Sequence, residues 1–151
     1  MFKKAKILLQ DQLKRGVSVK GLSRTLAAGV ICGTFPLLGL TTGLSFVVGS
    51  IFKLNHAILQ MVNYFLAAVQ VIMIPVYISI GEWLVGATPV SLNIKVMIQD
   101  FSRDFFLFLK NYGMAGLHAI LAWAILSVPL GFLVYSISKY FLLKSKLERG
   151  L

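Results

Sequence analysis

The chain of 151 residues has room for one domain, and 58% of its residues are hydrophobic while only 13% are charged. These proportions, with a mean hydropathy of +0.84, exceed those of an ordinary soluble domain and predict an all-α membrane protein. Fifteen Lys and Arg against five Asp and Glu give a net charge of +10. Because the basic residues stand beside apolar segments, anionic membrane lipids are the predicted partner, and nucleic acid is not.

Residues 1–21 predict a basic amphipathic helix that lies in the headgroup layer of a membrane. Apolar side chains recur at spacings of three and four, which is the period of a helix face, at Phe2, Ala5, Leu9 and Leu13. A solvated helix packed against a protein neighbour fits the same pattern. Gly16 is expected to end this helix, and Ser18 to cap the next one.

Residues 22–52 form an apolar run that is broken in its middle. The residues that break it are Gly33, Pro36, Gly39 and Gly43. A break at membrane depth is tolerated only where it is buried in protein or lines a wet cavity. The helical halves on either side have about twelve residues each, so at about 1.5 Å per residue each reaches roughly 18 Å, little more than half the hydrocarbon thickness. We therefore expect a re-entrant hairpin, with a pair of short crossing helices as the alternative.

The rest of the chain predicts two membrane spans separated by an amphipathic helix. Residues 55–87 can span the bilayer, with Pro75 kinking the helix or ending its regular part. Residues 91–111 carry apolar and charged side chains on opposite faces, which is typical of an interfacial helix. Residues 113–138 form a second span with a kink at Pro129, and a basic tail, residues 139–151, follows.

The distribution of basic residues predicts the topology of this single membrane domain, residues 1–151. Seven Lys and Arg precede residue 26, four follow residue 138, and Lys53 marks the end of the broken segment. A returning hairpin and two spans place all of these on one side, which the positive-inside rule identifies as cytoplasmic. We therefore expect a multi-pass protein of the bacterial inner membrane with both termini in the cytoplasm. Two tightly packed short crossings would give the same arrangement of charges.

The break offers the best-defined candidate site. Thr41 or Thr42 can cap the second half-helix, whose free N–H groups and positive dipole end would then face the bilayer interior. Broken helices of this kind hold anionic groups in transporters, and Thr34 adds a third hydroxyl. Gly29 and Gly33, like Gly39 and Gly43, have the spacing that lets helix backbones approach closely. The alternative is a glycine-packed hairpin whose threonines satisfy only their own backbone.

A polar stripe on the first span is the second candidate. Spacings of 4, 3 and 7 place the stripe residues on one helix face, namely His56, Gln60, Asn63 and Gln70. Amides inside a membrane usually form hydrogen bonds to a neighbouring helix. In the functional interpretation, the stripe faces the threonines of the break and lines one polar cavity with them.

Two other ionisable residues receive weaker interpretations. Glu82 is the only acid within either predicted span, but beside Trp83 and the following turn it is expected to be interfacial and wet. His118 has no acid or second histidine three or four residues away, so a metal site is not expected. No nucleophile–base pair or phosphate loop is visible, and Cys32 is single, which excludes an internal disulfide. We expect no enzyme activity, metal or cofactor.

The segment around the break resembles a bacterial family named domain of unknown function 2062. The resemblance covers roughly residues 16–87 and rests on a GxFPxxGxTT core followed by Asn and Gln at fixed distances. Its residues are Ala28, Gly29, Gly33, Thr34, Phe35, Pro36, Gly39, Thr41, Thr42, Asn55, Gln60, Asn63, Gly81 and Glu82. The resemblance implies a small membrane protein, sometimes fused or adjacent to glycosyltransferases. This chain has no glycosyltransferase portion.

These observations favour a protein that binds or translocates an anionic, lipid-like molecule in envelope metabolism. The end of the half-helix at Thr41 and Thr42 would receive the headgroup, and Gln60, Asn63 and Gln70 would line the path. The alternative is a non-catalytic membrane subunit that anchors or organises a glycan- or lipid-modifying enzyme such as a glycosyltransferase. Because two spans and one hairpin enclose little polar space, we also expect a homo-oligomer.

Overall fold

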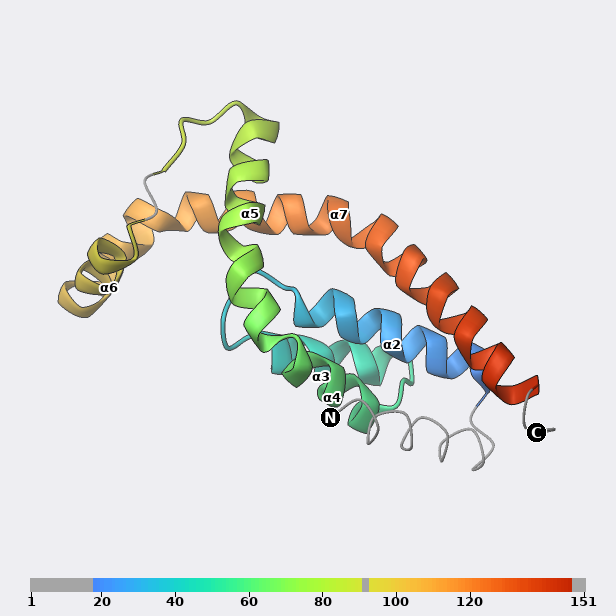
Figure 1. The fold of residues 1–151 in the computed structure, drawn as a ribbon. Coiled ribbons are helices and arrows are strands. Elements are labelled where there is room, and N and C mark those ends of the chain that lie inside the picture. The colour runs from blue at the N-terminus through green and yellow to red at the C-terminus, as the bar shows by residue number, and fades with distance from the viewer. Residues whose placement is uncertain (1–17, 91–92, 148–151) are drawn as a thin grey trace.

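The computed structural model describes residues 18–90 and 93–147, and the regular structure in these ranges is entirely helical (Figure 1). The helices are α2 (Val19–Gly33), α3 (Thr41–Ile51), α4 (His56–Phe65), α5 (Ala67–Val85), α6 (Ile94–Arg103) and α7 (Phe105–Leu147). The predicted all-helical fold is confirmed for these residues. The predicted N-terminal helix lies outside the described residues as far as residue 17.

The two halves of the broken segment pack against each other as an antiparallel pair, α2 and α3. α2 begins as predicted, because the Ser18 hydroxyl accepts a hydrogen bond from the Gly21 amide at 3.0 Å. Just after α3, the Asn55 amide donates to Thr25 Oγ1 at 3.4 Å. This bond brings the end of α3 beside the first turns of α2, so the break lies at the opposite end of the pair.

The segment predicted as one span, residues 55–87, is two helices. Leu66 ends α4 and precedes α5, and its amide donates to the carbonyls of both Val62 and Asn63 at 3.1 Å. Such a tightened turn stops α4 after ten residues. Pro75 lies inside α5 without ending it. No Gly or Pro marks the division at Leu66. Of the two helices that replace the predicted span, α5 alone is long enough to cross a membrane.

The C-terminal elements also differ from the predicted ones. α6 ends at Arg103 because Asp104 is extended, with a φ of −156°. α7 then runs for 43 residues through Pro129 to Leu147. It therefore joins the end of the predicted amphipathic helix, the predicted second span and most of the predicted basic tail in one element. The tail is helical as far as it is described.

Among the described residues, two helices are long and apolar enough to cross a membrane, namely Ala67–Val85 and the stretch Tyr112–Ser145 of α7. Only 28% and 6% of their most apolar windows are buried, whereas the core helix of a soluble protein would be mostly covered. Their apolar surfaces therefore face outward. At about 1.5 Å per residue, the 34 residues of Tyr112–Ser145 reach roughly 51 Å, which exceeds a hydrocarbon layer of about 30 Å and requires tilt or projection.

α7 packs against both α5 and α2 and thereby links them. Its N-terminal half is crossed by α5, and its C-terminal half runs along α2 (Figure 1). At the crossing, a Cβ added to Gly81 would overlap the backbone carbonyl of His118, and the buried α7 residues there are alanines, Ala115, Ala119 and Ala122. Further along, Leu142 packs with Leu22 of α2 and Ile58 of α4. The hairpin is thus held against both α4 and α7.

Candidate functional site

A buried amide ties α5 to the break. Gln70 is 5% exposed, and its Nε2 donates to the backbone carbonyls of Phe35 at 2.8 Å and Leu37 at 3.3 Å. These carbonyls lie between the last turn of α2 and the first turn of α3, so helix bonding does not reach them. Gln70 therefore bonds backbone that lies outside both helices, where the Leu37 carbonyl also accepts the Leu40 amide at 3.4 Å.

Two further amides tie α4 to the first turn of α3. Asn63 Nδ2 donates to Thr42 Oγ1 at 3.4 Å and to Gln60 Oε1 at 3.4 Å. Gln60 Nε2 donates to the Thr42 carbonyl at 3.3 Å. The predicted orientation of the stripe toward the break is thus confirmed for these two residues and for Gln70. All three distances here are long, which makes each bond modest.

The threonines behave differently from one another. Thr34 Oγ1 donates to the carbonyls of Val30 and Ile31 at 3.0 and 3.2 Å, so it satisfies its own helix, as the structural alternative predicted. The predicted capping by Thr41 or Thr42 is wrong, because α3 begins at Thr41 and its capping residue is Leu40, which makes no side-chain bond. Thr41 is buried and Thr42 exposed. Binding of a ligand by these threonines and amides stays a prediction.

The four glycines of the two predicted small-residue pairs have different surroundings. A Cβ on Gly29 would lie 2.9 Å from Val62 Cβ, and one on Gly33 would lie 3.3 Å from Asn63 Cα. These two glycines let α2 approach α4 closely. Gly39 has a φ of +83°, which suits glycine in the turn, while Gly43 has open space around it. Only the first pair serves helix packing.

Two ionisable side chains of the candidate set lie away from the break. His56 stacks near Phe46, with ring centroids 5.2 Å apart, and fills the space above Gly49 at the far end of α3. Glu82 is 4% exposed, and its Oε1 accepts a hydrogen bond from the Val90 amide at 3.0 Å. The expectation that Glu82 would be wet is wrong, because the loop after α5 folds back over it.

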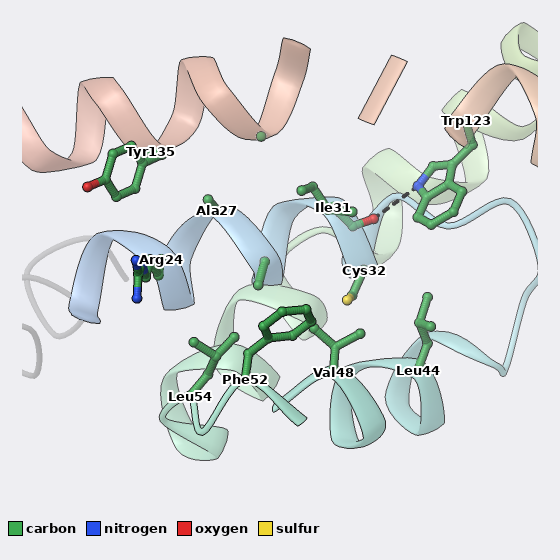
Figure 2. A pocket seen from close by; sticks show the side chains of 12 residues that line it. Arg24, Ala27, Ile31, Cys32, Leu44, Val48, Phe52, Leu54, Trp123 and Tyr135 are labelled. Atoms are coloured by element: carbon green, nitrogen blue, oxygen red, sulfur yellow. Dashed lines mark hydrogen bonds between the residues drawn. The ribbon is translucent and has the colours of Figure 1, made fainter. Parts of the chain in front are cut away.

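An open apolar groove of about 610 Å³ lies between α2, α3 and α7 (Figure 2). Its lining residues are Arg24, Ala27, Ala28, Ile31, Cys32, Leu44, Val48, Phe52, Leu54, Trp123, Gly131 and Tyr135. Figure 2 shows Arg24 and Tyr135 toward one end and Trp123 toward the other. Trp123 Nε1 donates to the Ile31 carbonyl at 3.1 Å, and its ring packs edge-to-face on Phe35 with centroids 4.9 Å apart. The groove therefore has one cationic end and one aromatic end.

Basic residues stand on three segments that pack around the cationic end of the groove, and we term this set of residues the basic end. Its members are Lys20 and Arg24 of α2, Lys53 after α3, and Lys139 and Lys144 of α7. The Thr25–Asn55 bond and the packing of Leu142 on Leu22 hold these segments together. Lys139 Nζ lies 5.9 Å from the Tyr135 ring centroid. Charges that are far apart in sequence thus form one positive surface.

A second apolar cavity, of about 660 Å³, lies on the other side of the break. It is bounded by residues 36–38 of the break together with residues of α5, α6 and α7, and none of the described residues that line it is charged. Near it, the Tyr112 hydroxyl donates to Asp100 Oδ2 at 3.1 Å and ties α6 to α7. The basic end therefore distinguishes the first groove from this cavity.

Sequence reasoning missed the groove. Arg24 was visible as a basic residue near the start of an apolar segment, but its partners Trp123 and Tyr135 lie about a hundred positions away. The Trp123–Ile31 bond spans 92 residues, and no local pattern predicts which face of α7 meets α2. An arginine one turn inside an apolar helix was the available signal.

Comparison with known proteins gives one family. The model of an uncharacterised protein family conserved in bacteria, DUF2062, matches residues 4–149. The match extends well beyond the resemblance seen around the break and includes α6 and α7. No curated protein and no solved structure matches the chain.

Proposed function

The chain belongs to the uncharacterised bacterial family DUF2062, and we propose that it binds an anionic, lipid-like molecule of the bacterial envelope. The site alone supports this function, because the fold and the family name no activity. The basic end carries the proposal, since five cations from α2, α7 and the turn after α3 converge beside an open apolar groove. Positive charge next to apolar surface is what an anionic amphiphile requires.

The proposal includes a topology in the inner membrane. Residues 22–52 would enter and return on the same side as a re-entrant hairpin, and α5 and α7 would cross, bent at Pro75 and Pro129. Support comes from the antiparallel packing of α2 and α3 and from the shared position of Arg24, Lys53 and Lys139. With the basic end on the cytoplasmic side, both chain termini would be cytoplasmic.

Lipid selectivity of the purified protein tests this function. Reconstituted protein is titrated with spin-labelled phosphatidylglycerol or phosphatidylcholine, and the motionally restricted fraction is measured by electron paramagnetic resonance. We expect a larger restricted fraction for phosphatidylglycerol, and we expect the difference to shrink at high salt because exposed charges are screened. Replacing Lys20, Lys53 and Lys139 by Gln should reduce it as well.

Equal restriction of the two lipids in the unmodified protein would contradict the proposal. That result would favour the alternative, a non-catalytic membrane subunit that organises an envelope enzyme, since such a subunit needs no lipid preference. Translocation is tested separately, by following movement of labelled phosphatidylglycerol between leaflets of the same vesicles. An unchanged rate would restrict the function to binding.

A further inference from the structure

We propose that the groove between α2, α3 and α7 holds one acyl chain of an anionic phospholipid, with the phosphate at Arg24 and the chain directed toward Trp123. This inference rests on the proposed function and deepens it by naming a site and the orientation of the lipid in it. The basic end as a surface could attract lipid without any defined site. The groove adds a place for one molecule.

Charge and polarity decide the occupant. Among the described residues that line the groove, Arg24 is the only charged one, and it lies with Tyr135 toward the same end. A guanidinium forms paired hydrogen bonds with phosphate oxygens, and a phenolic hydroxyl can add a further donor. The remaining lining is apolar apart from the Cys32 thiol and the already bonded Trp123 nitrogen. A phosphate followed by a hydrocarbon chain matches this sequence of surfaces.

The depth of the groove suits a chain rather than a headgroup alone. Arg24 and Cys32 are eight residues apart on α2, which at about 1.5 Å per residue is roughly 12 Å along the helix. Trp123 bounds the inner end, and its bond to the Ile31 carbonyl fixes the indole in place. In the proposed topology, the Arg24 end lies at the cytoplasmic surface and the Trp123 end lies deeper, which is the direction in which a lipid points.

Fluorescence of Trp123 tests the site directly. The chain has two tryptophans, and Trp83 is 79% exposed, so Trp83→Phe leaves Trp123 as the only indole reporter. The protein is reconstituted in phosphatidylcholine and titrated with lipid that carries bromine on its acyl chains. We expect brominated phosphatidylglycerol to quench Trp123 at a lower mole fraction than brominated phosphatidylcholine does.

Two charge-matched variants locate the phosphate. Arg24→Gln should raise the phosphatidylglycerol fraction needed for half-quenching about tenfold, because loss of a charge-assisted contact has an effect of that order. Lys20→Gln removes the same charge from the basic end but not from the groove lining, so as one of five surface cations it should raise the value far less than Arg24→Gln does. Equal effects of the two variants would overturn the site, because they would mean that only the surface charge matters.

A variant whose larger side chain fills the groove gives an independent check. Val48 lines the groove from α3, and Val48→Phe should reduce quenching of Trp123 by both brominated lipids, with the thermal unfolding temperature recorded to verify the fold. Undiminished quenching in a folded variant would overturn the inference. The two proposals fail separately. Spin-label selectivity without selective quenching contradicts the groove alone, and loss of both contradicts the proposed function.

Discussion

The two ends of the α2–α3 hairpin differ in whether their polar groups have partners within the chain. At the break, Gln70 donates to the Phe35 carbonyl outside the helices, while Gln60 and Asn63 bond the carbonyl and the hydroxyl of Thr42 in the first turn of α3. At the basic end, five cations gather, while the acids of the described residues, Glu82, Asp100 and Asp104, belong to the α5–α7 side of the fold. The break is therefore satisfied within the chain, whereas the basic end has charge to offer a ligand.

This difference changes how the polar residues in the apolar run are interpreted, from ligand-binding residues to structural ones. The threonines and amides were attractive as a ligand site because they are polar residues in an apolar run. Gln70 bonds backbone carbonyls of the break, Gln60 and Asn63 bond Thr42, and Thr34 bonds its own helix, so contacts within the chain account for these residues. Four variants, ordered by the size of the expected effect, measure how far the break is structural. The basic end should be insensitive to all of them.

The largest effect is expected where α2 meets α4. In Gly29→Ala, the new Cβ would lie 2.9 Å from Val62 Cβ, an atom fixed to the α4 backbone, so overpacking should destabilise the fold by about 2 kcal/mol. Unfolding in mixed micelles, followed by circular dichroism, measures the change. A variant as stable as the parent would mean that α2 and α4 separate easily, and the hairpin would then not depend on α4.

Loss of the Gln70 amide should come next. Gln70→Leu leaves the Phe35 and Leu37 carbonyls without their buried donor, which should destabilise the fold by about 1.5 kcal/mol in a membrane environment. The same unfolding assay applies. Selectivity for phosphatidylglycerol should persist in the folded fraction. If stability were unchanged and lipid selectivity lost, Gln70 would be a ligand residue as first predicted from the stripe.

A substitution that is expected to raise stability checks the interpretation of the glycines. Gly43 lies in the first turn of α3 with open space where a Cβ would go, so Gly43→Ala should stabilise the protein by about 1 kcal/mol through helix propensity. Comparison with Gly29→Ala in the same micelle assay makes this a matched pair. Destabilisation by Gly43→Ala would indicate that a second copy of the chain, or another partner, approaches α3 at this residue.

The smallest effect is expected at Thr42. Its hydroxyl accepts one long bond, at 3.4 Å from Asn63, so Thr42→Val should change stability by about 0.5 kcal/mol. The spin-label assay should give an unchanged preference for phosphatidylglycerol. Loss of that preference would instead place the headgroup at the start of α3, and would reverse the contrast between the two ends of the hairpin.

Much of this molecule follows from local pattern. Composition alone determined an all-helical protein with long apolar helices, and Gly33, Pro36 and Gly39 determined the position of the break, because backbone that glycine and proline interrupt cannot continue a helix. The 4–3–7 spacing of the stripe placed its amides on one face. The cap at Ser18 was equally local. None of these depends on knowing which elements become neighbours.

The tertiary structure decided the rest. No Gly or Pro marks the end of α4 at Leu66, whereas α7 runs for 43 residues although Gly113 and Pro129 lie inside it. The burial of Glu82 depends on a loop that folds back to donate from Val90. The groove forms only because α7, with Trp123, packs beside α2, with Arg24, about a hundred residues earlier in the chain. Local chemistry determines where a helix breaks, but only packing decides which side chains remain available to a ligand.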